Sequence, residues 1–220
     1  MVKMTVFKDN TALILIDIQN DFCPGGALEV GEGNEIVEVA NKLQEKFRVK
    51  IATQDWHPPN HTSFASNHLD KLPFSTTEMF YGTQVLWPDH CIQGKKGAEF
   101  HPKLITNSTD LIIRKGFRTE IDSYSAFFDN DHKTSTGLGG YLKARGINSI
   151  YLCGLALDFC VYFSAIDGVN LDLEVNVIKD ACRAIDLDGS LEMAINDMKN
   201  KGVNLTVSYT HLRAHETSNH

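Results

Sequence analysis

The sequence predicts an α/β fold of three layers, in which helices cover both faces of a doubly wound, mainly parallel sheet of six strands. Six segments rich in β-branched and aliphatic residues recur along the chain, and stretches with helical spacing of apolar residues separate them. The strand segments are near-continuous apolar runs, which is typical of parallel strands buried on both faces. This alternation indicates one open sheet with helices on each side.

The predicted elements follow one another along the chain. Strands are expected at residues 12–17, 50–55, 110–115, 149–154, 174–180 and 203–209. Helical spacing links Ile36, Ala40, Leu43 and Phe47, then Val161, Ala165 and Val169, then Leu191, Ala194, Ile195 and Met198. Residues 56–97 form a long irregular stretch rich in Pro, Gly, Asn and His, and loops of this length usually carry a function. Residues 67–84 within it contain no motif that we can interpret.

The bulk composition indicates one domain that acts on a small molecule. The chain has 220 residues, 42% of them hydrophobic, which suffices for one large core spanning residues 1–209. Residues 210–220 form a polar tail without periodicity, expected to be disordered or non-native. The net charge of -7 disfavours binding to nucleic acid or to an anionic membrane surface. Whether the chain forms a homo-oligomer is left open.

The N-terminus lacks the apolar core of a secretory signal, and no later apolar run approaches the roughly 18 residues of a membrane span. A cytoplasmic location is therefore expected. The five cysteines are scattered and lack any CxxC spacing. They are expected to be reduced thiols, because this pattern does not resemble a disulfide framework.

Reactive residues follow the ends of four predicted strands. Asp17, Asp55 and Lys115 end the first three strands, and Cys160 comes shortly after the fourth. Because ligands bind at the carboxyl ends of the strands in open α/β sheets, these side chains are expected to face one crevice. Any one of them alone would more often be structural. Their joint placement favours a catalytic set.

The roles within this set follow from the chemistry of the groups. Cys160 precedes a predicted helix, whose dipole is expected to lower the pKa of the thiol, and a nearby Lys115 ammonium would stabilise the thiolate further. Asp17 could accept the thiol proton and later donate it to a leaving amine. The three residues thus predict a nucleophile, a base and an orienting charge.

A second cluster suits a divalent metal ion. Asp55 and His57 stand two residues apart, and His90 follows in the segment 87–91, Trp-Pro-Asp-His-Cys. One carboxylate and two imidazoles suit zinc, manganese or iron, and a ligand set with few thiolates is typical of catalytic sites with open positions. Three further loop histidines are weaker candidates: His61, His68 and His101.

Five blocks of sequence carry a family resemblance. They are residues 15–28 (LIDIQNDFCPGGAL), 55–58 (DWHP), 87–91 (WPDHC), 115–116 (KG) and 154–161 (GLALDFCV). In this order they resemble the nicotinamidases, also called pyrazinamidases, of the isochorismatase-like cysteine hydrolases, and the resemblance covers residues 12 to 207. The sequence departs from the family pattern at Leu157, where many members carry Thr.

The resemblance implies a catalytic triad and a mechanism. The triad would be Asp17, Lys115 and Cys160, and one divalent ion, zinc or else manganese or iron, would be held by Asp55, His57 and His90. Hydrolysis of nicotinamide, and of pyrazinamide, would pass through a thioester on the cysteine and release ammonia, a reaction of NAD salvage.

The resemblance also implies the surroundings of the substrate. The peptide bond before Ala156 would be cis, and the N–H groups of Ala156 and Cys160 would form an oxyanion hole. Substrate-binding residues are expected in the aromatic side chains of the pocket and next to the oxyanion hole: Phe22, Trp87, Tyr124 and Leu155.

Two other functions compete with this interpretation. The first is a relative of the same fold that acts on another small amide or on a carbamoyl group; isochorismatases lack the nucleophilic cysteine, and carbamoyl hydrolases generally lack the Asp-x-His metal set. The second is a non-catalytic metal-binding or redox-sensing protein with an oxidisable Cys160. Such a protein would have no use for Asp17 and Lys115.

Overall fold

The computed structural model describes residues 7–208 and contains the predicted parallel sheet. Six strands lie in the order β5-β2-β1-β6-β7-β8, and every neighbouring pair is parallel. The strands are β1 (Thr11–Ile16), β2 (Val49–Asp55), β5 (Leu111–Lys115), β6 (Ser149–Leu155), β7 (Glu174–Arg183) and β8 (Asn204–Thr206). All six predicted strands are therefore confirmed.

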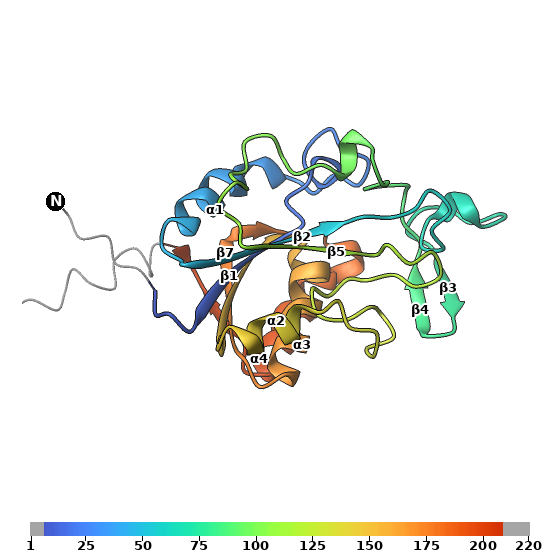
Figure 1. The fold of residues 1–220 in the computed structure, drawn as a ribbon. Helices are drawn as coiled ribbons and strands as arrows, with labels where there is room; N and C mark the ends of the chain where they lie inside the picture. Colours follow the sequence, from blue (N-terminus) through green and yellow to red (C-terminus); the bar gives the residue numbers. More distant parts are fainter. Residues whose placement is uncertain (1–6, 209–220) are drawn as a thin grey trace, which may run out of the picture.

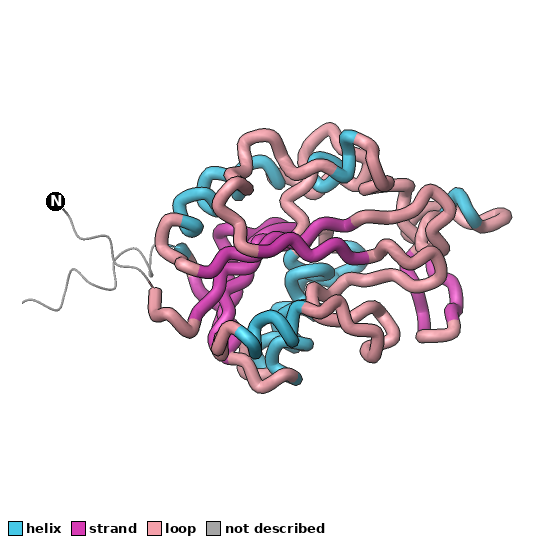
Figure 2. The backbone as a smooth tube through the Cα atoms, viewed as in Figure 1, coloured by secondary structure: helices cyan, strands magenta, loops and turns pink. Residues whose placement is uncertain are grey.

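Helices cover both faces of this sheet, as Figures 1 and 2 show. Helix α1 (Ile36–Gln44) lies on one side, and α2 (Leu138–Ala144), α3 (Tyr162–Asn170) and α4 (Ser190–Asn200) lie on the other. The three predicted helices correspond to α1, α3 and α4, and the three-layer fold is confirmed. Helix α1 ends before Phe47, whose ring instead stacks on Phe7 with centroids 4.2 Å apart.

The topology places a crevice beside β1. From β1 the chain moves outward to β2 and β5, and then returns to β6 on the other side of β1 before continuing to β7 and β8. Ligands bind at such a switch point, where connections from neighbouring strands diverge. Strand β1 is buried along its whole length, so its carboxyl end is held firmly in the core.

Two elements were not predicted from the sequence. Helix α2 contains Gly139 and Gly140, which are poor helix formers, so its pattern is weak. A separate antiparallel hairpin of β3 (Thr76–Met79) and β4 (Gly82–Val85) lies within the stretch that had no recognised motif. Most of the hairpin is exposed or half-buried, so it carries no apolar alternation that would reveal it.

Some boundaries also differ from expectation. Strand β7 continues to Arg183 because a register shift opposite Leu152 and Gly154 lets its last residues pair again with β6. The last strand ends at Thr206 rather than at residue 209, which lies outside the described residues together with the predicted polar tail.

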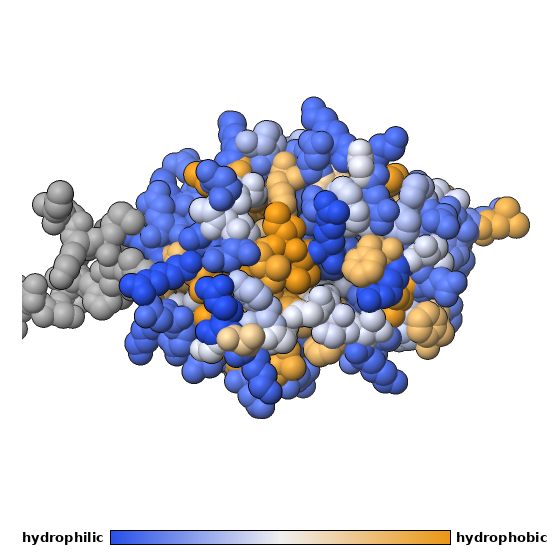
Figure 3. Space-filling view, viewed as in Figure 1, coloured by the Kyte–Doolittle hydropathy of each residue, from blue (hydrophilic) through white to orange (hydrophobic). Residues whose placement is uncertain are grey.

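The surface visible in Figure 3 is mostly hydrophilic, with apolar atoms gathered near its centre. Strand β5 is an edge strand of the sheet. Its residue Ile112 is about half exposed. Among residues 7–208, no helix has the length and apolar character needed to cross a membrane.

Candidate active site

Lys115, at the end of β5, holds three of the predicted residues together. Its side chain is completely buried, and its Nζ lies 2.5 Å from Asp55 Oδ1, 2.8 Å from Asp17 Oδ2 and 3.5 Å from Cys160 Sγ. It also donates a hydrogen bond to the carbonyl of Ser123 at 2.8 Å. We call these four residues, Asp17, Asp55, Lys115 and Cys160, the charged centre. They come from the ends of three strands and from the turn after β6.

Asp17 turns sharply out of β1 toward the centre. Its φ is +46°, a left-handed conformation that Asp adopts more readily than most residues. Thr53 on the neighbouring strand fixes it twice, because its hydroxyl accepts from the Asp17 N–H at 3.1 Å and donates to Oδ1 at 2.6 Å. A carboxylate oxygen of Asp17 lies within 4.8 Å of Cys160 Sγ. Asp17 is therefore placed to exchange a proton with the thiol.

The two buried carboxylates have opposite pKa shifts. Burial and, to a smaller extent, the Asp55 charge raise the pKa of Asp17, and together they outweigh the lowering by Lys115 and Thr53. For Asp55, burial also acts to raise the pKa, but Lys115 and His57 outweigh it and hold the pKa well below the usual range. Two carboxylates whose pKa values are pushed apart commonly have different tasks. Asp55 thus stays ionised, and Asp17 is the more basic of the two.

The Asp17 and Asp55 carboxylates keep Lys115 positively charged. Burial alone would lower the pKa of this amine, but the adjacent Asp17 and Asp55 carboxylates raise it well above its usual value. A buried ammonium with two carboxylate partners satisfies the rule that buried charges occur in pairs. Lys115 therefore remains a fixed positive charge.

Cys160 lies in a π-helical turn, Leu157–Val161, that leads directly into α3. Burial raises the pKa of its thiol well above the usual range; Lys115 lowers it, but the Asp17 and Asp55 carboxylates raise it again. The expected lowering of this pKa by the helix start is therefore wrong. The thiol is protonated in this arrangement, which makes a neighbouring base necessary.

Asp55, His57 and His90 converge as predicted. Asp55 Oδ2 lies 3.5 Å from His57 Nε2 and 3.8 Å from His90 Nε2. The Nδ1 atoms of the two rings lie 2.8 Å from the carbonyls of Gly116 and Pro88, respectively. A carbonyl only accepts hydrogen bonds, so each Nδ1 donates a proton to it, and in the neutral ring each Nε2 then has a lone pair for a metal ion. This donor set fits a divalent metal ion.

Gly116 is required beside this cluster. A Cβ at this position would lie 2.3 Å from Cε1 of His57, and the residue has a φ of +64°. Any side chain would therefore displace the imidazole, and the conformation itself favours glycine. The sequence pair Lys115-Gly116 thus serves both the charged centre and the metal cluster.

The weaker histidine candidates are engaged elsewhere. His61 lies beside His57, with ring centroids 4.4 Å apart, but its Nδ1 bonds Ser63 Oγ at 2.7 Å and its Nε2 lies 3.2 Å from the carbonyl of Ile121. Both nitrogens are therefore occupied, and burial together with His57 lowers the pKa of the ring to about 4. His68 bonds the carbonyl of Thr62. His101 accepts a hydrogen bond from the N–H of Lys103.

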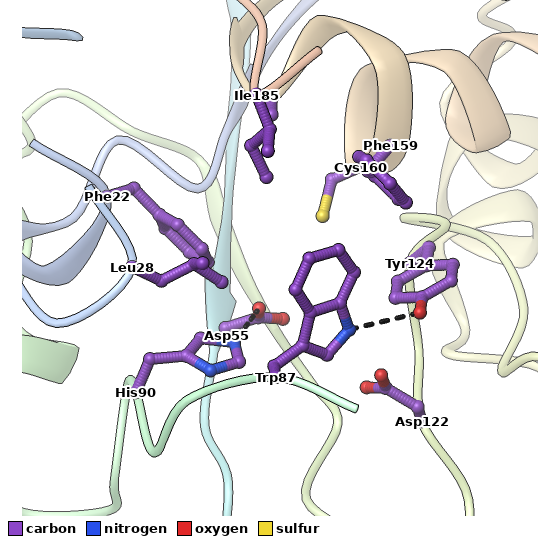
Figure 4. A pocket seen from close by; sticks show the side chains of 11 residues that line it. Phe22, Leu28, Asp55, Trp87, His90, Asp122, Tyr124, Phe159, Cys160 and Ile185 are labelled. Carbon is purple, nitrogen blue, oxygen red and sulfur yellow. Dashed lines mark hydrogen bonds and ion pairs between the residues drawn. The ribbon is translucent and has the colours of Figure 1, made fainter. Parts of the chain in front are cut away.

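A cavity opens over the charged centre and the metal cluster (Figure 4). It is small, and both polar and aromatic side chains line it. Of the residues predicted at the site, Phe22, Asp55, Trp87, His90, Tyr124, Ala156 and Cys160 line it. Four further lining residues were not predicted, namely Leu28, Asp122, Phe159 and Ile185.

Leu155 is placed differently from its expected role. It is the last residue of β6, is completely buried, and directs its side chain toward Gly33 rather than into the cavity. Side chains of a strand alternate between its faces, and this one faces the core. The peptide bond that follows Leu155 is cis, as the resemblance implied.

Gln19 is a further residue that sequence reasoning missed. It is fully buried, its Nε2 donates to the carbonyl of Asp55 at 2.9 Å, and its Oε1 accepts from the Asp55 N–H at 2.8 Å. The side chain thereby replaces a missing strand partner and fixes the backbone of Asp55. Its signal in the sequence was a glutamine two residues beyond Asp17, directly after an apolar strand.

Comparisons with known proteins agree with this geometry. The isochorismatase domain model matches residues 11–208. A nicotinamidase of Acinetobacter baylyi is 54% identical over 195 residues, which cover 89% of this chain and 91% of that protein. The solved structure of an Acinetobacter baumanii nicotinamidase and pyrazinamidase has a TM-score of 0.92 at 52% identity and covers 93% of this chain and 99% of that one.

A more distant structure, the pyrazinamidase of Pyrococcus horikoshii in complex with zinc, has a TM-score of 0.73 at 32% identity and covers 90% of this chain and 99% of that one. The family model thus spans nearly all the described residues, and identity to the nearest of these relatives exceeds one half. The chain belongs to the isochorismatase family and, within it, to the nicotinamidases.

Proposed function

We propose that this protein hydrolyses nicotinamide, and also pyrazinamide, to the corresponding acid and ammonia, with Cys160 as the nucleophile. The observation that carries the proposal is the single buried Lys115 ammonium in contact with Asp17, Asp55 and the thiol beneath one cavity. The names of the similar proteins support the substrate class. A single hydrolase domain over residues 1–209 is part of this proposal.

In the proposed reaction Asp17 carries out every proton transfer. Asp17 accepts the thiol proton as Cys160 Sγ attacks the carboxamide carbon, and a tetrahedral oxyanion forms. Asp17 then gives this proton to the leaving nitrogen, so the C–N bond breaks and ammonia departs. Water next attacks the thioester and loses a proton to Asp17, which returns it to the thiolate. The raised pKa of Asp17 suits a group that takes and gives a proton in turn.

The oxyanion would be held by the backbone N–H groups of Ala156 and Cys160. The carbonyl of Ala156 accepts from the N–H groups of Phe159 and Val161, which flank Cys160 in the π-helical turn. These bonds hold the turn rigid around the nucleophile. Backbone donors fixed in advance are effective because no reorganisation is needed when the negative charge develops.

One divalent metal ion would be held by Asp55, His57 and His90, whose free Nε2 and carboxylate atoms suit it. We propose zinc, in line with the zinc-containing pyrazinamidase structure, although manganese and iron accept the same ligands. When bound, the ion supplies a Lewis acid that can coordinate the ring nitrogen of the substrate and so orient the ring.

The substrate ring would pack against Phe22, Trp87 and Tyr124, which we call the ring wall. The Trp87 and Phe22 side chains are almost fully buried, and Trp87 Nε1 donates to the Tyr124 hydroxyl at 3.0 Å (Figure 4). Flat apolar faces with a few polar groups are typical of pockets for aromatic ligands. A cytoplasmic location stays a prediction, and whether the chain forms a homo-oligomer stays open.

The direct test is release of ammonia from nicotinamide by the purified protein. We expect turnover by the wild type and a loss of at least about a thousandfold in Cys160→Ala, because the nucleophile is gone. Cys153→Ala is the matched control, since Cys153 is a buried thiol in β6 outside the cavity. Near-wild-type turnover by Cys160→Ala would refute the assigned nucleophile.

A further inference from the structure

Gln84 is a buried amide at the boundary between the exposed hairpin and the cavity. It lies in β4 and is only 1% exposed, although its neighbours in the strand face solvent or are half-buried. Strand β4 runs directly on toward Trp87, three residues later, so the hairpin delivers this part of the ring wall. In Figure 1 the hairpin stands apart from the main sheet.

The amide nitrogen of Gln84 faces the polar side of the cavity. Its Nε2 lies 2.9 Å from Asp122 Oδ2, 2.8 Å from the Tyr124 hydroxyl and 2.7 Å from the carbonyl of Val85. Asp122 and Tyr124 both line the cavity. The Asp122 carboxylate accepts hydrogen bonds from the Gln84 amide and from the Ser123 N–H.

The amide oxygen of Gln84 faces two donors. Its Oε1 accepts from the Tyr81 hydroxyl and from Asn130 Nδ2, each at 3.1 Å. Asn130 is oriented in turn, because its Oδ1 accepts from the backbone N–H of Tyr124 at 3.0 Å. The carbonyl of Val85 can only accept, so the nitrogen of Gln84 must point toward Val85 and Asp122 and its oxygen away from them. The amide therefore fits its neighbours in one orientation only.

This arrangement links the hairpin to all the polar atoms of the ring wall. The Tyr124 hydroxyl lies between Gln84 Nε2 and Trp87 Nε1, at 2.8 Å and 3.0 Å. Loss of the amide would leave buried polar groups unsatisfied, and they would move to recover partners. The rings of Tyr124 and Trp87, which carry these polar atoms, would move as well.

We propose that Gln84 is a positioning residue, which sets the orientation of Tyr124, Trp87 and Asp122 and thereby the fit of the substrate ring. The inference rests on the proposed function, because the ring it concerns is that of nicotinamide. Gln84 does not touch the charged centre. Its loss therefore weakens substrate binding and leaves the reactivity of Cys160 unchanged.

The test compares steady-state kinetics of Gln84→Met, which keeps the side-chain length and removes both polar functions, with the wild type. We expect KM for nicotinamide to rise about tenfold while kcat stays within about twofold. Iodoacetamide, which needs no ring wall, should label Cys160 at the wild-type rate. Thr83→Val, which removes only an exposed hydroxyl from the same strand, is the control and should match the wild type.

A purely structural role for Gln84 would give a different pattern. It would lower kcat and the labelling of Cys160 together, through a smaller folded fraction, at unchanged KM, and this result would overturn the proposal. If Gln84→Met does not fold, Tyr81→Phe decides, because it removes one donor to Gln84 Oε1 and should raise KM about threefold. A KM within about 1.5-fold of wild type there would also overturn it.

A readout without substrate separates this proposal from the proposed function. The chain has two tryptophans, so Trp56→Phe leaves Trp87 as the reporter. In that background Gln84→Met should shift the Trp87 emission, whereas an unchanged spectrum would refute the role of Gln84. Absence of ammonia release by the wild type would instead refute the proposed function, and the emission would still decide on Gln84.

Discussion

Every member of the charged centre ends or follows a parallel strand of the sheet. The members of the ring wall lie outside the sheet: Phe22 ends a single 3-10 turn, Trp87 follows an exposed hairpin, and Tyr124 lies on a loop. The charged centre consists of buried ions that compensate one another around Lys115. The ring wall is held by neutral hydrogen bonds and aromatic contacts, such as the edge-on packing of Trp87 against Phe159 at 4.9 Å. The sheet thus fixes the proposed reacting groups, and segments outside the sheet fix the shape of the pocket.

This difference has a kinetic consequence. Groups that act on the reacting atoms contribute mainly in the transition state, so their loss lowers kcat. Groups that hold the unreactive ring contribute in the ground state as well, so their loss raises KM. Substitutions in the charged centre should therefore lower kcat, whereas substitutions in the ring wall should raise KM.

Apart from loss of the Cys160 thiol itself, the largest effect should come from Asp17→Asn, which keeps the shape of the side chain and removes the proposed base. We expect kcat to fall by about a thousandfold, within the usual range for a general acid–base group, with KM nearly unchanged. Asn retains an oxygen that can accept from Thr53, so circular dichroism should show a folded protein. A kcat within tenfold of wild type would contradict the shuttle.

The pH profile of the wild type tests the same residue. Asp17 must be ionised to accept the thiol proton, so kcat/KM falls as the pH decreases through its pKa. Burial raises this pKa above 3.8, so the acid limb should lie above that value. Metal content measured at each pH separates this limb from loss of the ion. If kcat/KM of Asp17→Asn also falls at the same pH, the acid limb belongs to another group.

For His57→Ala we expect a smaller fall in kcat than for Asp17→Asn, but a clear loss of bound metal. Loss of a direct ligand should weaken metal binding by at least about a hundredfold, since even the loss of a supporting residue costs ~10–100-fold. Elemental analysis should then find far less than one ion per chain. His132→Ala is the control, because this side chain is 63% exposed and remote from the cluster. A full equivalent of metal in His57→Ala would refute the ligand.

The smallest effect should come from Phe22→Leu in the ring wall. The Phe22 ring packs edge-on against His90, with centroids 5.4 Å apart. An aromatic contact of this kind contributes about 0.5–1.5 kcal/mol, so KM should rise between about twofold and about thirteenfold at constant kcat. Phe80→Leu, at an exposed ring of the hairpin, should change neither value. A fall in kcat for Phe22→Leu would contradict the separation of the two regions.

The same contrast explains what the sequence could predict. The strands were recognisable as apolar runs, and their ends were marked by Asp17, Asp55 and Lys115, so the charged centre followed from pattern and topology. The pKa values within the charged centre could not be predicted from the sequence. The raised pKa of Cys160 results from burial and from two carboxylates that only the folded chain brings near it.

The ring wall was only partly predictable. Phe22, Trp87 and Tyr124 followed from the resemblance, but Gln84 and Asp122 are polar residues in stretches without periodicity, where sequence position says nothing about burial. Leu155 was expected at the substrate because of its neighbours in the chain. The alternation of side chains along β6 turns it to the core instead.

The most direct test of the account is to look for the acyl-enzyme. The purified protein would be mixed with excess nicotinamide, quenched in acid within one turnover, and analysed by mass spectrometry, with hydroxylamine added in a parallel reaction to intercept the thioester. We predict a nicotinoyl group on the peptide that contains Cys160, and a hydroxamate product in the parallel reaction. Continuous ammonia release with neither the adduct nor the hydroxamate would contradict covalent catalysis by Cys160.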